Sequence, residues 1–337
     1  MTITGPGSVR LRTTGPPAPR PGWARVRVRA CGVCGTDAHY LNGMALPPGV
    51  AYPVVPGHEV AGTVAEIAPA DAVRAGVAVG DLVMPHLIIP CGTCEACASG
   101  REQLCPTAPI LGIHEPGGLA DELLWPVDRL VPATGIDPVA AAVLPDAVAT
   151  AHHALTTADV PRGGLLCVYG AGGVGTAVLM LARALDPGVR LAAVVRGAAT
   201  ARRVGALGVS AFAGATARDV RAAVGSADAV IDFTGSPDTP SEAVKVLRPG
   251  GRLVAGSVAP GDLGLGRLLP FVTREVTVSG TYTSTIDDLR RVAGLVRDGH
   301  LDVSGLVSHR LPLDRAAEAF DLLARRPDGL VRVVVEP

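Results

Sequence analysis

The sequence predicts an α/β protein of two domains, one rich in β-strands and one built on a doubly wound parallel sheet. Its 337 residues exceed what a single hydrophobic core usually supports. Alternating apolar and polar residues over 9–30, followed by dense turn residues up to about residue 118, are typical of short strands in an all-β region. From residue 165 onward, apolar runs alternate with helical stretches, which is typical of parallel strands joined by crossovers.

The expected elements follow from these two patterns. In the first, a proline-rich break separates two alternating stretches, and no long helix is expected before about residue 138; the strands are expected at 9–12 and 26–29. In the second, strands are expected at 165–169, 191–195, 229–232, 253–255 and 276–278, and helices at 174–185 and 200–207. The tail is expected to be helical over 287–323 and to end in a strand at 331–335.

Composition and charge narrow the range of functions. Charged residues make up 18% of the chain and the net charge is −1, so no basic surface favours nucleic acid as a partner. No apolar run reaches the roughly 18 residues of a membrane span, and residues 1–6 lack the features of a signal peptide. These observations predict a cytoplasmic protein without a nucleic-acid or membrane partner.

The cysteines provide the strongest chemical signal. Cys91, Cys94, Cys97 and Cys105 lie close together, and the chain has 7 cysteines in all. A clustered, odd set in a chain expected to be cytoplasmic favours metal over disulfides. A zinc site closed by four protein thiolates is structural and activates no water, so we predict a structural zinc here. An iron–sulfur cluster, or four unrelated core cysteines, are the alternatives.

A second candidate metal set is scattered along the first part of the chain. Cys34, His58 and Asp146 supply one sulfur, one imidazole nitrogen and one carboxylate. Three protein ligands with an open fourth position are the arrangement of a catalytic zinc. The residues alone leave two alternatives open, a redox pair of Cys31 with Cys34 and a histidine with a structural role.

A glycine-rich turn joins an expected strand to the helix that follows it. The turn contains Gly170, Gly172, Gly173, Val174 and Gly175. Such glycines permit a tight turn, close approach of a pyrophosphate and close packing of helix on strand, and the helix N-terminus presents free N–H groups to phosphate. The turn therefore predicts a dinucleotide site, with a purely structural turn as the alternative.

The end of the next expected strand bears on the choice of nucleotide. An acidic residue there would accept hydrogen bonds from the ribose of NAD, but Val195 holds that position and Arg196 follows it. Because a guanidinium suits a 2′-phosphate, the sequence favours NADP(H) over NAD(H). An arginine that is merely solvated on a loop is the alternative.

Taken together, these motifs resemble those of the zinc-dependent medium-chain dehydrogenases, which include alcohol, polyol and threonine dehydrogenases. Residues 31–39 resemble the family's first catalytic-zinc motif, residues 56–62 its second, residues 80–85 the stretch before its cysteine lobe, and residues 91–105 the lobe.

The resemblance implies a domain organisation. It predicts a β-rich, GroES-like catalytic domain over 1–147 that contains a zinc lobe at 90–106, and a Rossmann cofactor domain over 148–281. Residues 282–337 are expected to return to the catalytic domain, and the active site is expected in the cleft between the two domains.

The resemblance also assigns roles to residues of the catalytic domain. It implies that Cys34, His58 and Asp146 bind the catalytic zinc, and that the four clustered cysteines bind the structural zinc. Four further residues match family positions, namely Thr36 for the alcohol hydroxyl, His39 for proton relay, Asp37 for support of the zinc ligands and Glu59 for approach to the metal. Cys31 matches no ligand.

Cofactor contacts follow from the same resemblance. Thr150 and Val174 match residues that hold the nicotinamide ring, and Arg332 matches a basic residue near the cofactor pyrophosphate. The implied chemistry is hydride transfer to C4 of the nicotinamide, with zinc as Lewis acid on the alcohol oxygen and with Thr36 and His39 carrying the proton away.

The substrate is the least defined part of the prediction. His86 falls where the family's pocket wall lies, and His114 lies in a stretch that resembles polyol and sugar-acid dehydrogenases. These polar groups favour a polyhydroxylated, sugar- or cyclitol-like secondary alcohol. A position of either histidine behind the pocket or at the surface is the alternative. A simple secondary alcohol or ketone, a non-catalytic NAD(P)H-binding protein and zinc-independent quinone or enoyl reduction are the alternatives. A homodimer or homotetramer is expected.

Overall fold

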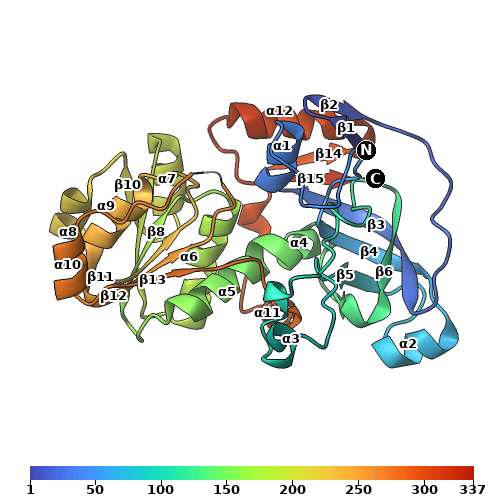
Figure 1. The fold of residues 1–337 in the computed structure, drawn as a ribbon, viewed down its shortest axis with the longest axis horizontal. Coiled ribbons are helices and arrows are strands. Elements are labelled where there is room, and N and C mark those ends of the chain that lie inside the picture. Colours follow the sequence, from blue (N-terminus) through green and yellow to red (C-terminus); the bar gives the residue numbers. More distant parts are fainter. Residues whose placement is uncertain (260) are drawn as a thin grey trace. The chain divides into compact units, whose positions relative to one another are not determined.

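Two large sheets organise the chain, each with its own hydrophobic core (Figure 1). The computed structural model describes residues 1–259 and 261–337. One compact unit consists of Met1–Ala149 with Ser284–Pro337, and a second consists of Thr150–Thr283. The first unit is thus built from both ends of the chain, and the second is a continuous insertion between them.

The sheet of the first unit has seven strands in the order β14-β15-β3-β4-β5-β7, with β6 also pairing with β3. All its neighbours are antiparallel except β14 and β15, which run parallel. Its strands are β3 (Trp23–Val33), β4 (Glu59–Glu66), β5 (Leu82–Pro85), β6 (Glu122–Pro126), β7 (Leu130–Pro132), β14 (His309–Pro312) and β15 (Val333–Glu336). A separate hairpin pairs β1 (Thr2–Gly5) with β2 (Ser8–Arg10).

Strand β3 shows why this sheet forms. Along it, Val26 and Val28 are buried and Arg27 is exposed, so apolar and polar faces alternate as in a half-buried strand. The inner face packs around Trp125, which is fully buried and meets Trp23 edge to face at 6.1 Å between ring centroids.

Short helices surround this sheet. They are α1 (Gly35–Leu41), α2 (Pro69–Ala75), α3 (Glu95–Ala98), α4 (Pro138–Ala142), α11 (Ile286–Arg297) and α12 (Ala316–Arg325), with single turns η1 (Glu102–Leu104), η2 (Val127–Arg129), η4 (Ser304–Leu306) and η5 (Leu313–Arg315). The segment η3 (Leu144–Val148) is a π-helix that continues from α4. Such short π-helical segments occur mostly within α-helices and often at functional sites.

The second unit holds the parallel sheet that the sequence predicts. Its six strands follow the order β10-β9-β8-β11-β12-β13, and all of them run parallel. This order is that of a doubly wound fold. The strands are β8 (Leu165–Tyr169), β9 (Arg190–Val195), β10 (Ser210–Ala213), β11 (Ala227–Asp232), β12 (Leu247–Ala255) and β13 (Thr277–Gly280). The helices are α5 (Ala149–Ala158), α6 (Gly173–Leu185), α7 (Ala198–Gly205), α8 (Ala217–Val224), α9 (Thr239–Val246) and α10 (Leu268–Thr273).

The tail differs from the expectation of a helix over 287–323. It forms two helices, α11 and α12, with strand β14 between them. β14 is stabilised by its parallel pairing with β15 near the end of the chain, and such non-local pairing leaves little trace in a segment of four residues. Within the described part of the chain, no helix is both long and apolar enough to cross a membrane.

Candidate active site

Three neighbouring strands of the first sheet carry most of the candidate site at their ends. Cys34 directly follows β3, and His58 directly precedes β4, the antiparallel neighbour of β3. On the other side of β3, Arg332 directly precedes β15. The strand order therefore gathers, at one end of the sheet, residues that lie far apart in the sequence.

The π-helix η3 adds Asp146 to this group. Its Oδ2 lies 3.5 Å from Sγ of Cys34 and 3.6 Å from Nε2 of His58. Together with a carboxylate oxygen of Glu59, these ligand atoms lie within 4.8 Å of one another. Two ligands of one tetrahedral zinc, each about 2.0–2.3 Å from the metal, are themselves about 3.3–3.8 Å apart. The donor set and its spacing therefore fit zinc.

Asp37 orients both Cys34 and His58. Its Oδ1 lies 3.5 Å from Nδ1 of His58 and accepts the N–H of Gly57 at 3.3 Å, while its Oδ2 accepts the N–H of Cys34 at 3.0 Å. Because Nδ1 of His58 faces Asp37, Nε2 is left to face Cys34 and Asp146, as a metal-ligating imidazole requires. Gly57 has φ +101, and a Cβ there would lie 2.6 Å from Sγ of Cys31, so only glycine fits before His58.

The two carboxylates beside His58 favour a positive charge at this position, which a bound metal cation would also supply. Burial lowers the pKa of His58, but Asp37 and Asp146 outweigh it and raise that pKa well above its usual value. Burial raises the pKa of Asp146, but contact with His58 outweighs it and holds that pKa below its usual range. Asp146 therefore carries the negative charge that a metal ligand needs.

Glu59 and Arg332 form a buried ion pair beside these residues. Nη1 of Arg332 donates to Oε1 of Glu59, and the two residues are 5% and 0% exposed. Burial raises the pKa of Glu59, and the positive charge of Arg332 in direct contact opposes this shift and stabilises the carboxylate. Oε2 of Glu59 has no hydrogen-bond partner among the described residues, so it is available to the cluster. The expected contact of Arg332 with a pyrophosphate stays a prediction.

Helix α1 places the two predicted proton-transfer residues next to Cys34. Oγ1 of Thr36 lies 3.8 Å from Sγ of Cys34, and Thr36 is half-buried. His39 lies in the last turn of α1 and is also half-buried, with no hydrogen-bond partner for its Nδ1 in the described part of the chain. Their roles toward an alcohol stay predictions.

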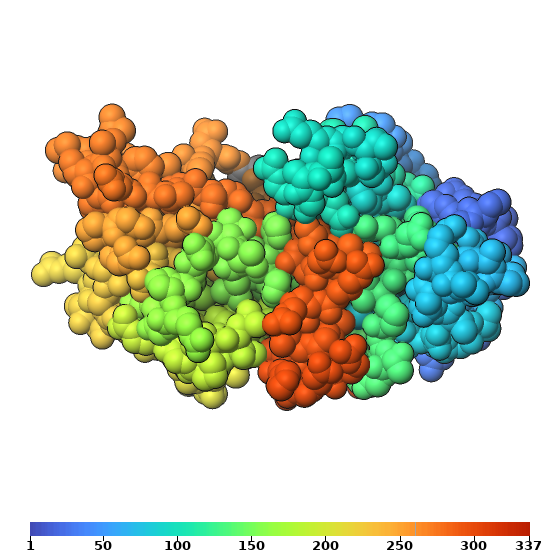
Figure 2. All heavy atoms as spheres, turned by 90° about the horizontal axis from the view of Figure 1, so that it is seen from below, coloured from blue at the N-terminus to red at the C-terminus, as the bar shows by residue number. Residues whose placement is uncertain are grey.

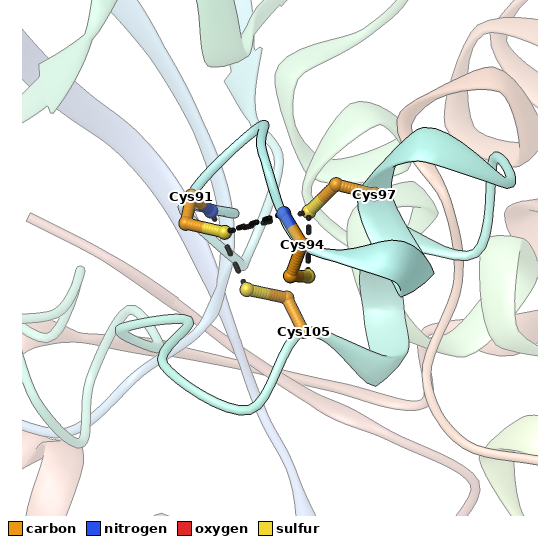
Figure 3. Close-up of side chains that lie close together, drawn as sticks. All are labelled: Cys91, Cys94, Cys97 and Cys105. Atoms are coloured by element: carbon orange, nitrogen blue, oxygen red, sulfur yellow. Dashed lines mark hydrogen bonds between the residues drawn. The ribbon is translucent and has the colours of Figure 1, made fainter.

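The four clustered cysteines form a lobe of their own around α3 and η1 (Figure 3). Sγ of Cys97 lies 4.0 Å from that of Cys91 and 3.5 Å from that of Cys94, and all four sulfurs lie within 4.8 Å of one another. Backbone N–H groups of Thr93 and Cys94 lower the pKa of Cys91 to about 5. Four cysteine sulfurs at this spacing fit a closed zinc site.

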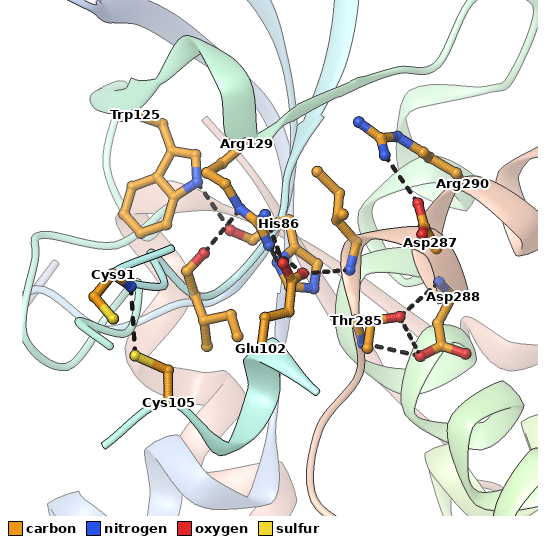
Figure 4. Close-up of polar contacts among 12 residues, drawn as sticks. His86, Cys91, Glu102, Cys105, Trp125, Arg129, Thr285, Asp287, Asp288 and Arg290 are labelled. Carbon is orange, nitrogen blue, oxygen red and sulfur yellow. Dashed lines mark hydrogen bonds and ion pairs between the residues drawn. The ribbon is translucent and has the colours of Figure 1, made fainter. Parts of the chain in front are cut away.

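His86 does not line an open pocket wall, because it is fully buried. Its Nδ1 lies 2.7 Å from Nη2 of Arg129, whose guanidinium pairs with Glu102 at 2.6 Å, and its carbonyl accepts the indole N–H of Trp125 at 2.8 Å (Figure 4). Burial and the charge of Arg129 lower the pKa of His86 to about 3. His86 therefore belongs to the interior, whereas His114 is exposed.

The second unit carries the glycine turn between β8 and α6. Gly170 has φ +83, and a Cβ on Gly175 would lie 1.9 Å from the carbonyl oxygen of Gly170, so both positions require glycine. At Gly172, the N-cap of α6, a Cβ would meet nothing within 4 Å. The free space beside this helix N-terminus fits the approach of a phosphate.

The predicted cofactor residues occupy different environments. Val195 is buried at the end of β9, and Arg196 directly after it is exposed. Thr150 is buried near the start of α5, and Val174 is half-buried in the first turn of α6. Their contacts with a nucleotide stay predictions.

One contact with the glycine turn was not predicted. Arg203, on α7, donates from Nη2 to the carbonyl of Ala171 at 2.7 Å and from Nη1 to Oγ1 of Thr176 at 3.3 Å. The sequence contains no signal that separates Arg203 from its neighbour Arg202, because only the helix orientation decides which one faces the turn.

Known families match both parts of the chain. Residues 20–135 match the alcohol dehydrogenase GroES-like domain, and residues 173–298 match the zinc-binding dehydrogenase family. The chain belongs to the zinc-dependent medium-chain dehydrogenases. The family confirms the predicted fold class, a GroES-like domain with a Rossmann domain, and the predicted activity, that of a zinc-dependent alcohol dehydrogenase that uses NAD(P).

Relatives of this dehydrogenase cover almost its whole length. It is 31% identical to the L-galactonate-5-dehydrogenase of Escherichia coli over 90% of this chain and 89% of the relative. It is 26% identical to the erythritol/L-threitol dehydrogenase of Mycolicibacterium smegmatis over 95% and 92%. A zinc-binding dehydrogenase of Sinorhizobium meliloti, solved with NADP bound, superposes with a TM-score of 0.88 at 28% identity, over 100% of this chain and 98% of that one.

Proposed function

We propose that this dehydrogenase oxidises a polyhydroxylated secondary alcohol to the ketone and passes the hydride to NAD(P)⁺. The buried group of Cys34, His58 and Asp146 carries this proposal, because it combines a zinc-ligand set with an orienting carboxylate, Asp37. The names of the Escherichia coli and Mycolicibacterium relatives, an L-galactonate and an erythritol/L-threitol dehydrogenase, support a polyol or sugar-acid substrate.

We assign two zinc ions to each subunit. Cys34, His58 and Asp146 would hold the catalytic ion, and the four cysteines of the lobe would hold the structural ion, namely Cys91, Cys94, Cys97 and Cys105. When bound, the catalytic ion supplies a Lewis acid that polarises an alcohol oxygen. Zinc analysis of the purified protein is expected to give two ions per subunit, and a value near one would contradict this assignment.

The chain's own residues would orient the ligands and move a proton. Asp37, whose Oδ1 lies 3.5 Å from Nδ1 of His58, would orient the ring of His58. Thr36, beside Cys34, would accept the hydroxyl proton of the substrate in a hydrogen bond, and His39 on the same helix would pass it on. Glu59, held by Arg332, keeps a second carboxylate beside the site.

A substrate survey tests the proposed reaction. Polyols, sugar acids and simple secondary alcohols are offered with NAD⁺ and NADP⁺, and the absorbance of the reduced nicotinamide is followed. The highest kcat/KM is expected for a polyhydroxylated secondary alcohol. A preference for unsubstituted secondary alcohols would favour the simpler alternative, and no turnover with any alcohol or ketone would refute the proposal.

We infer that NADP(H) is preferred over NAD(H). Val195 offers neither the hydrogen bonds that NAD needs nor repulsion against a 2′-phosphate, and Arg196 is exposed beside it. A charge-assisted hydrogen bond contributes about 1.5–3 kcal/mol, of which an exposed site retains the lower part, so a preference of about tenfold is expected. The NADP-bound Sinorhizobium structure supports this choice.

A double variant tests the cofactor assignment. Val195→Asp with Arg196→Ala is expected to shift the ratio of kcat/KM values toward NAD(H) by about tenfold or more. Arg202→Ala, one exposed arginine of the next helix, serves as the control. A wild-type enzyme that already prefers NAD(H) several-fold would refute the role of Arg196.

We also propose that the unit Met1–Ala149 with Ser284–Pro337 is the catalytic domain and that Thr150–Thr283 binds the cofactor. A homodimer or homotetramer is supported by exposed apolar residues of α10, namely Leu268, Leu269 and Val272, close in sequence to the edge strand β13. Light scattering should give the mass of two or four subunits, and Leu268→Glu with Leu269→Glu should lower it.

A further inference from the structure

The cysteine lobe contains an acid that does not face its thiols. Glu102 lies in η1, between Cys97 and Cys105, and its side chain is 17% exposed. Its Oε1 accepts Nη2 of Arg129 at 2.6 Å, and its Oε2 accepts Nη1 of Arg129 at 3.1 Å (Figure 4). This fork geometry holds the Glu102 carboxylate in one orientation.

The same carboxylate also binds the tail of the chain. Oε1 of Glu102 accepts the backbone N–H of Ile286 at 2.8 Å, across 184 residues of sequence. Ile286 is the first residue of α11, whose N-cap Thr285 binds Asp288 in a capping box. Figure 2 shows the lobe, in teal, beside the orange-red segment that begins with α11. Glu102 therefore anchors the start of α11, where a negative charge is favourable.

Helix α11 in turn supports the π-helix that carries Asp146. It packs against η3 and β7, and its inner face buries Ile286, Leu289 and Val292. In η3 the bond from Val148 N to Val143 O is 3.3 Å long, beyond the usual length of an N–H···O bond, and β4 and β5 contact η3 as well as α11. The position of Asp146 therefore depends in part on α11, one of the elements that pack against η3.

We propose that Glu102 is a positioning residue for Asp146: it fixes the start of α11, and α11 fixes η3. Through this link the folded cysteine lobe controls how well the other candidate site holds its metal. The inference rests on the proposed function for the identity of Asp146 as a ligand, but the mechanical link from Glu102 to η3 can be measured independently.

Two matched pairs of variants test the link. Glu102→Gln removes the charge that binds Arg129 and α11, and Glu95→Gln makes the same change at an exposed site of the lobe. Ile286→Pro removes the N–H that Glu102 accepts and also shortens the buried side chain. Proline fits the first helical position, and Thr285 already has the extended conformation that must precede it. Ile286→Val shortens the side chain to a similar degree and keeps the N–H.

The measurements use the metal-loaded enzyme. Cobalt(II) replaces zinc in both sites and distinguishes them, because a site with four thiolates and a site with one thiolate give different charge-transfer intensities. A chelator then removes the cobalt, and the decay of each signal gives the rate of metal release from that site. Loss of positioning groups around a metal ligand typically changes metal affinity by about 10–100-fold. We therefore expect Glu102→Gln and Ile286→Pro to release the one-thiolate metal about tenfold faster, with faster hydrogen exchange over 144–148 and a lower kcat at unchanged KM.

The controls Glu95→Gln and Ile286→Val are expected to match the wild type. The proposal would be overturned if all four variants had equal rates of metal release and equal hydrogen exchange over 144–148. It would also be overturned if Glu102→Gln and Ile286→Pro lost the metal of the cysteine lobe before the metal of the one-thiolate site. If Glu102→Gln fails to fold, the Ile286 pair decides. If the wild type binds metal only in the lobe, the proposed catalytic site is wrong, and exchange over 144–148 still decides whether Glu102 controls η3.

Discussion

The two candidate metal sites of the first unit are assembled in opposite ways. The cysteine lobe takes all its ligands from residues 91–105, and none of its thiols needs another part of the chain to approach the other three. The second site joins Cys34 to Asp146 across 112 residues and takes its ligands from two strand ends and a π-helix. One site depends on local turns, and the other depends on the whole unit.

Their electrostatic surroundings differ as well. Cys91 is exposed, whereas His58 and Glu59 are buried next to Asp37 and Arg332. Buried charges are costly unless they are paired, and here each ionised group has a partner of opposite charge. A closed local site can therefore stabilise its lobe alone, whereas a buried distributed site is positioned for chemistry only when the tertiary structure is correct.

The sharpest test of the comparison makes the same substitution in both sites. Cys34→Ser removes a ligand of the distributed site and is expected to lower kcat/KM by at least about 10³-fold, because Lewis-acid stabilisation is worth several kcal/mol and 1.4 kcal/mol is a decade. Its melting temperature should change by only a few degrees. Ordinary turnover in purified, metal-loaded Cys34→Ser would contradict the assignment of this site.

Cys97→Ser makes the matching change in the lobe. Metal binding by a local site contributes directly to folding, so this variant is expected to melt about 10 °C lower by calorimetry, while the fraction that stays folded keeps measurable turnover. Ala98→Ser adds a hydroxyl to the adjacent exposed position and should leave the melting temperature unchanged. The two sites would not be separable if Cys97→Ser and Cys34→Ser had the same profile.

Acid should weaken the attachment between the lobe and the sheet. His86, buried against Arg129, has a pKa of about 3 in the folded protein and 6.5 as its ordinary value. A lowered folded pKa means that the unfolded chain binds the extra proton, so the stabilisation is complete above pH 6.5 and falls as the pH drops toward 3.

As the pH falls from 6.5 to 5, His86 alone should lower the unfolding free energy of the wild type by about 2 kcal/mol, because the slope is 1.36 kcal/mol per pH unit. Urea denaturation of His86→Gln should therefore show a pH dependence that is flatter by about this amount. His300→Gln, at an exposed position, is the control. An unchanged slope in His86→Gln would show that another group governs the acid response.

Much of the architecture could be predicted because its signals are local. The alternation along β3, the apolar run of β8 and the glycine turn that follows it each reflect short-range rules of burial and backbone geometry. The prediction of a continuous helix over 287–323 was wrong at β14, because that strand forms through its pairing with β15. The sequence left two positions open for His86, in the pocket wall or away from it, because its burial depends on Arg129 and Glu102 from elsewhere in the chain.

The residues of the candidate sites also differ in whether local sequence or tertiary contacts determine their positions. Ligand types, spacing and the residues of the four-cysteine lobe were readable from the sequence, because one short segment contains the complete set. Only the folded chain showed that Asp146 reaches Cys34 and His58 from a π-helix, that Arg332 pairs with Glu59, and that Arg203 contacts the glycine turn. These contacts join segments more distant than any sequence period, so strand order and helix packing decide them.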